Sequence, residues 1–179
     1  MNWPVFSLLV YVLLALTFAL GSALELGGVR PEPVLVLVAY VALMADWRRT
    51  GWAALSVGLC LDLLHPYAGG VVLVGPYALG LLVGAFVVHQ LRNVVFRHSL
   101  LTVVILTVIC GLFAEVFSTS LVAVRTLPWP LGEALVGWGA ADALFGGFLS
   151  VLYTAVFAVP VGLGLLALER WMRFGEGRG

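Results

Sequence analysis

The sequence contains no lysine and few charged residues of any kind. Its 179 residues include nine Arg and nine Asp or Glu, so 10% of the chain is charged and the net charge is zero. A soluble domain typically carries about 25% charged residues. This composition therefore excludes an ordinary soluble globule. It also excludes a nucleic-acid-binding protein, because no basic surplus is present to neutralise phosphates.

Signatures of metal and catalytic sites are also absent from the sequence. The two cysteines, Cys60 and Cys110, each lie inside an apolar run, and no CxxC or Cys/His cluster accompanies them. That pattern indicates neither a disulfide framework nor a metal site. The sequence also lacks HExxH and GxSxG motifs and a phosphate-binding loop. We therefore expect no catalytic residues, no metal and no cofactor, and we expect the protein not to be an enzyme.

Apolar residues make up 63% of the chain, and their runs continue almost to the C-terminus. A membrane-spanning helix needs about 20 such residues, and the period-2 alternation of a membrane barrel is missing. We expect a single all-α integral membrane domain over residues 1–179, a bundle of six transmembrane helices. The expected spans are residues 5–26, 33–47, 51–64, 71–90, 99–124 and 143–168.

The second and third expected spans are short, so they would need a thinned bilayer or interfacial flanks to cross it. Trp47-Arg48-Arg49 is expected to close the second span. Pro31, Gly58, Gly69 and Gly70 are assigned to structural turns, because proline and glycine interrupt helices.

The arginines predict the orientation of the chain in the membrane. With six spans, seven arginines fall on one side, and Arg30 and Arg125 fall on the other. The seven are Arg48, Arg49, Arg92, Arg97, Arg170, Arg173 and Arg178. Positive charge is concentrated in cytoplasmic loops, so both termini are expected in the cytoplasm.

Asp62 and Glu115 are the two charges that this topology does not explain. Both are expected in the outer half of the membrane, at similar depth, where an ionisable group is costly and usually faces the protein interior or a wet cavity. Three roles for Asp62 remain open. It could be a structural group that holds the 65–70 turn or accepts hydrogen bonds from backbone amides, a partner or ligand contact in an outward cavity, or part of a proton or ion relay. The structural role is favoured, because a relay would place charges at several depths.

Two rows of small residues would let helices approach closely. Ala15, Ala19 and Ala23 form one row, and Gly80 and Gly84 form a GxxxG pair. Such rows serve packing inside a bundle or contact with a partner helix. If a partner helix binds, we expect it on the small-residue face of the first or fourth span.

The order of these features resembles the rod shape-determining protein MreD family. The resemblance starts with Arg30-Pro31, an apolar helix with Tyr40 and a basic break. It continues through the glycines and the aspartate of GLCLDLLHPYAGG, at residues 58–70, and a helix that carries Tyr77, Gly80 and Gly84. It ends with the last span, from Leu152-Tyr153-Thr154 through Pro160 to Glu169-Arg170, and covers most of residues 30–170.

The resemblance implies a multi-pass protein of the bacterial inner membrane that belongs to the cell-wall elongation machinery and has no enzymatic activity. The implied partner is an MreC-like bitopic protein. A RodA-type glycosyltransferase with its transpeptidase, MreB and membrane lipid are further expected partners. Residues expected at a partner contact or cavity are Arg30, Asp62, Tyr77, Gly80, Gly84 and Glu115.

The implied fold is similar to that of the substrate-binding subunits of energy-coupling-factor transporters. That likeness gives an alternative function, a substrate-binding subunit of a small-molecule (vitamin-type) importer. This alternative predicts an outward cavity lined by Asp62, Glu115 and aromatic residues.

Overall fold

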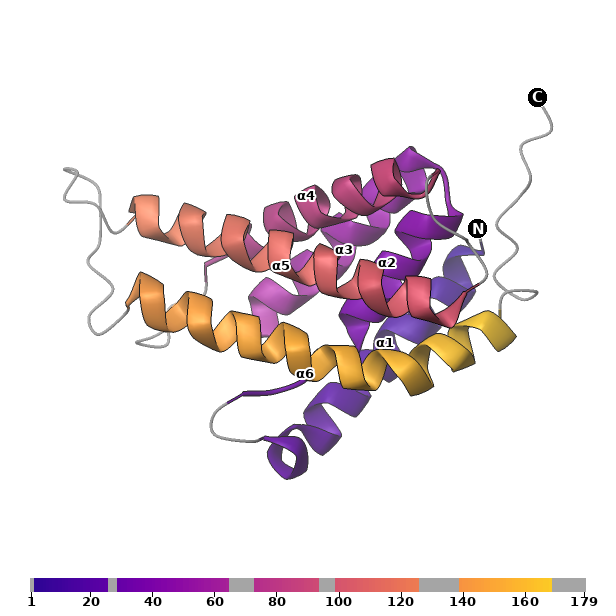
Figure 1. The fold of residues 1–179 in the computed structure, drawn as a ribbon, viewed down its shortest axis with the longest axis horizontal. Helices are drawn as coiled ribbons and strands as arrows, with labels where there is room; N and C mark the ends of the chain where they lie inside the picture. The colour runs from indigo at the N-terminus through magenta and orange to yellow at the C-terminus, as the bar shows by residue number, and fades with distance from the viewer. Residues whose placement is uncertain (1, 26–28, 65–72, 94–98, 126–138, 169–179) are drawn as a thin grey trace.

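A computed structural model describes residues 2–25, 29–64, 73–93, 99–125 and 139–168. The described residues form six helices and no strand, which confirms the all-α fold class (Figure 1). The helices are α1 (Trp3–Leu24), α2 (Val34–Met44), α3 (Trp47–Leu64), α4 (Pro76–Leu91), α5 (Leu100–Arg125) and α6 (Ala140–Ala167).

Two of the helices, α5 and α6, are long and apolar enough to cross a membrane by length and composition. They have 26 and 28 residues. Three shorter apolar helices lie in α1, α2 and α4. The structure thus supports the membrane expectation in its coarse form.

Helix α2 forms the centre of the bundle. All residues from Val34 to Leu43 are buried, and the helix contacts α3, α4, α5 and α6. A helix that is apolar on every side must be covered on every side. With 11 residues it is about 16 Å long, far shorter than the hydrocarbon core. Protein rather than lipid surrounds α2, which explains why so short a helix can be apolar throughout.

The other helices surround α2 unequally. Helix α5 runs antiparallel to both α4 and α6, and α5 and α6 extend beyond the rest (Figure 1). Helix α1 slants across the bundle, and between residues 2 and 19 its buried side chains are Phe6, Leu13 and Thr17. Helix α1 begins, and α6 ends, at the same end of the bundle (Figure 1).

Two expected helix boundaries are wrong. Trp47-Arg48-Arg49 does not close the second helix but forms the first turn of α3. The chain breaks at Ala45, which is extended (ψ 169°), and the carbonyl of Asp46 accepts the first helical bond from Thr50 (2.9 Å). The indole of Trp47 packs edge-on against the ring of Phe86, with 5.2 Å between the ring centroids. Trp47 therefore joins α3 to α4 and does not end α2.

The fourth helix begins at Pro76, not at residue 71, and residues 73–75 are not helical. Proline suits the first turn of a helix, where its missing N–H would have no intrahelical partner. Gly75, immediately before it, has a φ of 119°, which favours glycine over other residues.

Candidate functional site

Asp62, near the end of α3, holds the start of α4. Its side chain is almost fully buried, and its carboxyl oxygens accept hydrogen bonds from three backbone N–H groups. The donors are Gly75 (2.9 Å), Tyr77 (3.1 Å) and Ala78 (3.1 Å). The first amides of a helix have no intrahelical acceptor, so a carboxylate that accepts from them stabilises the helix start. This arrangement is the structural role that the sequence favoured.

Gly58 allows α3 to approach α4 closely enough for this cap. A Cβ atom built on Gly58 would lie 2.4 Å from the Cα of Ala78, a separation that real side chains do not adopt. Gly58 lies one helical turn before Asp62, inside α3. Its assignment to a turn is therefore wrong, because the residue serves helix packing.

A second polar contact joins α4 to α2 and α5. The phenol of Tyr77 donates a hydrogen bond of 2.6 Å to Glu32, just before α2. The carboxyl group of Glu115, on α5, interacts with the same phenol. Asp62 binds the backbone N–H of Tyr77, so this one residue connects both expected carboxylates.

Helix α6 completes this cluster, which we call the tyrosine cluster: Glu32, Tyr77, Glu115, Gly147 and Thr154. A Cβ atom on Gly147 would lie 2.5 Å from Oε2 of Glu115, so the carboxyl group occupies the space that a side chain would fill. The backbone N–H of Glu32 donates to the Thr154 hydroxyl (2.9 Å), which itself donates to the carbonyl of Ser150 (2.8 Å). The cluster therefore ties four helices together at one level of the bundle.

Gly80 and Gly84 pack inside the chain. A Cβ atom on Gly80 would lie 2.4 Å from the carbonyl oxygen of Ala114, and one on Gly84 would lie 2.4 Å from that of Cys110. Both glycines are buried, and α4 packs against α5. Since α5 fills this face of α4, the face is not available to a partner helix, and the expected contact there needs correction.

The remaining expected residues lie around the tyrosine cluster or outside the described chain. The exposed side chain of Arg30 forms an ion pair with Glu25, and its Nε donates a hydrogen bond of 2.9 Å to the Glu25 carboxylate. The backbone carbonyl of Arg30 accepts a hydrogen bond from the Ser150 hydroxyl (2.7 Å). Pro31 is buried in the non-helical stretch before α2. Gly69 and Gly70 lie outside the described residues.

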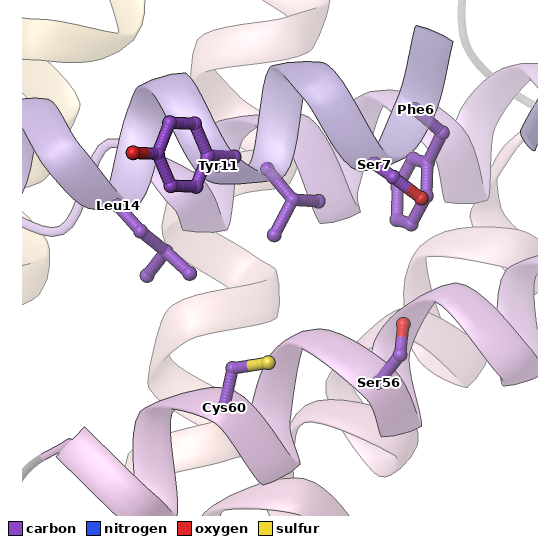
Figure 2. Close-up of a pocket in the computed structure, with 7 residues that line it drawn as sticks. Phe6, Ser7, Tyr11, Leu14, Ser56 and Cys60 are labelled. Atoms are coloured by element: carbon purple, nitrogen blue, oxygen red, sulfur yellow. The ribbon is translucent and has the colours of Figure 1, made fainter. Parts of the chain in front are cut away.

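A groove of about 290 Å³ separates α1 from α3 (Figure 2). Its lining residues on α1 are Phe6, Ser7, Val10, Tyr11 and Leu14, and those on α3 are Ser56 and Cys60. It is mostly apolar, and neither Asp62 nor Glu115 lines it. This groove is therefore not the carboxylate-lined cavity that the importer alternative predicts.

The sequence alone did not indicate that Glu32, Gly147 and Thr154 belong to the tyrosine cluster. The one available signal for Glu32 was its place between Pro31 and Pro33, at the start of an apolar helix. Nothing in the sequence relates Gly147 to Glu115. Among the described residues, no three His, Cys, Asp or Glu side chains come together in a way that could hold a metal ion.

Comparison with known proteins adds no relative. No protein family, curated protein or solved structure matches the chain.

Proposed function

We propose that the protein is a scaffold of the cell-wall elongation machinery in the bacterial inner membrane. In this role it binds an MreC-like bitopic protein and helps to maintain rod shape. One observation carries the proposal. Five of the residues on which the resemblance to the MreD family depends, Gly58, Asp62, Tyr77, Gly80 and Gly84, lie at the contacts that position α3, α4 and α5.

These contacts run through α3 and α4. Gly58 leaves room for Ala78, Asp62 accepts hydrogen bonds at the start of α4, and the phenol of Tyr77 binds Glu32. Gly80 and Gly84, further along α4, bring α5 close. Gly58, Asp62, Tyr77, Gly80 and Gly84 thus each help to position a helix. That use of polar and small residues suits a protein whose function is to present a fixed surface.

The partner surface in this proposal is the outward face of α1. Ala15 and Ala19, from the alanine row of the sequence, are exposed and lie opposite the buried Phe6 and Leu13. Small residues let a second helix approach a transmembrane helix closely. This face replaces the glycine face of α4 as the place where we expect the bitopic partner to pack.

Topology in the proposal is six spans with both termini in the cytoplasm. Helix α1 starts and α6 ends at the same end of the bundle, as expected when both termini lie on one side of the membrane (Figure 1). The proposed topology is also supported by Arg48 and Arg49, which begin α3, and by Arg92, which follows α4 and donates to the carbonyl of Ala45 (2.8 Å).

The test is co-purification with an MreC-like protein from the same genome, expressed together in membranes. The wild-type chain should retain the partner, and A15L/A19L should lose most of it. Ala141→Leu, an equal enlargement at an exposed position on α6, should retain it. No retention by the wild-type chain would refute the scaffold function, whereas retention by A15L/A19L would refute only the face. Deletion of the gene should round the cells, and A141L should restore the rods.

A further inference from the structure

We infer that the groove between α1 and α3 is a binding site for an anionic phospholipid, with one acyl chain in the groove and the phosphate at Arg49. This inference needs the chain to lie in a membrane but does not depend on the proposed scaffold function.

The groove itself has the properties of an acyl-chain site. Its lining is mostly apolar, and it includes Tyr11 on α1 and Ser56 on α3 (Figure 2), both of which are exposed. The groove is about 290 Å³ in volume and lies between α1 and α3. An empty space of this size would forfeit van der Waals contacts along both walls, so an apolar chain from the bilayer gains contacts by entering it.

The charge beside the groove identifies the headgroup. Residues seven and eleven positions apart return to nearly the same side of a helix, and Arg49 stands in this relation to Ser56 and Cys60. The Arg49 side chain is 39% exposed, and its Nε is 3.9 Å from Asp46, too far for a hydrogen bond, so this contact does not occupy the guanidinium N–H groups. Arg48 lies beside it, and no ion pair of Arg48 is found within the described part of the chain. This end of α3 is therefore complementary to a phosphate.

The distances fit one lipid molecule. Ser56 is seven residues from Arg49, about 10 Å along the helix, and Cys60 is about 16 Å away. The hydrocarbon of one leaflet is about 15 Å thick, half of the whole core, so a phosphate at Arg49 places its chain at the depth of the groove. Trp52, 67% exposed, lies between the two levels, where indoles are favoured at the membrane interface.

The test measures the lipids that stay bound to the protein. The chain is reconstituted into nanodiscs of equimolar phosphatidylcholine and phosphatidylglycerol, released gently and analysed by native mass spectrometry. The wild-type chain should retain phosphatidylglycerol in preference to phosphatidylcholine. Removal of one arginine near the surface, in Arg49→Gln, should reduce this preference about fivefold while phosphatidylcholine still binds.

Ser56→Phe places a ring in the groove and should reduce retention of both lipids. Val156→Phe is the matched control, because this exposed position on α6 lies outside the groove. Equal retention by S56F and V156F, or no headgroup preference in the wild-type chain, would overturn the inference. Loss of a co-purifying protein from S56F with unchanged lipid would also overturn it, and would assign the groove to a partner helix.

A second measurement avoids substitution entirely. Cys60 lines the groove, whereas Cys110 is fully buried, so a membrane-permeant maleimide should react selectively with Cys60. The reaction should be several-fold slower in phosphatidylglycerol nanodiscs than in delipidated detergent micelles. Equal rates would contradict occupation of the groove by lipid.

Discussion

The phenol of Tyr77 donates a 2.6 Å hydrogen bond to the carboxylate of Glu32, and this bond joins the start of α4 to the start of α2. The two residues are 45 positions apart in the chain. The backbone N–H of Tyr77 binds Asp62 on the other side. The first turn of α4 is therefore fixed by two carboxylates from two different parts of the sequence.

Tyr77→Phe should destabilise the protein by about 1–2 kcal/mol, because it leaves the Glu32 carboxylate without its phenol donor. The free energy of unfolding can be measured by titrating the purified protein with sodium dodecyl sulfate. Glu32→Ala, which removes the acceptor, provides the second arm of a double-mutant cycle. We expect the double variant to differ by about 1 kcal/mol from the sum of the two single losses of unfolding free energy. A double variant that equals this sum would show that the hydrogen bond contributes no stability.

Asp62→Ala should lower the free energy of unfolding by about 2 kcal/mol, because it removes the acceptor for three N–H groups at the start of α4. Asp62→Asn keeps one acceptor oxygen and should fall between Asp62→Ala and the wild-type chain. Hydrogen exchange should locate the loss, with faster exchange at Tyr77 and Ala78. Unchanged exchange at these two amides would refute the cap.

Gly84→Ala should destabilise the protein by about 1–3 kcal/mol, because its Cβ would lie 2.4 Å from a backbone oxygen of α5. The control is Gly164→Ala on α6, where nothing lies within 4 Å of the added atom. This second change should be neutral or stabilising by up to about 1 kcal/mol, as alanine is the better helix former. A thermal melt of both variants in detergent distinguishes them, and equal melting temperatures would argue against the close approach.

Two adjacent glycines on α6 give a sharper comparison. Gly147→Ala should displace the Glu115 carboxyl group and lower the melting temperature, whereas Gly146→Ala, with open space around its Cβ, should not. In a Glu115→Ala background the effect of Gly147→Ala should disappear, because the displaced group is gone. A persistent effect there would mean that Gly147 matters for another reason.

The proposed topology predicts which single cysteines an impermeant maleimide labels in intact cells. In a background without the native cysteines, a cysteine at position 30 should react from outside. Cysteines at positions 48 and 92 should react only after the membrane is permeabilised. Labelling of position 48 in intact cells would reverse the assigned orientation.

Much of the secondary structure could be predicted from composition and periodicity, because a long apolar run has few alternatives to a helix. The long α5 and α6 lie close to their expected ranges. The boundaries around Trp47 and Pro76 could not be read in the same way. There, an extended residue at Ala45 and a glycine with positive φ decide where a helix starts.

For the site, the sequence identified Asp62, Glu115 and Tyr77 but not what each one touches. A charge inside an apolar run signals that a partner must exist, since burial without one is costly. It does not say whether that partner is a ligand, another protein or the backbone of the next helix. Only the packing of α3 on α4 shows that the Asp62 carboxyl group binds amides.

The amino-acid sequence by itself determined that this chain is helical and apolar, because these properties depend on local composition. The tertiary structure decided the rest. It turned the glycine row of α4 inward onto α5, left Ala15 and Ala19 of α1 exposed, and enclosed α2 on all sides. Small residues allow close approach on any face. Which face is used depends on contacts between helices that are distant in the chain, and local sequence patterns do not encode those contacts.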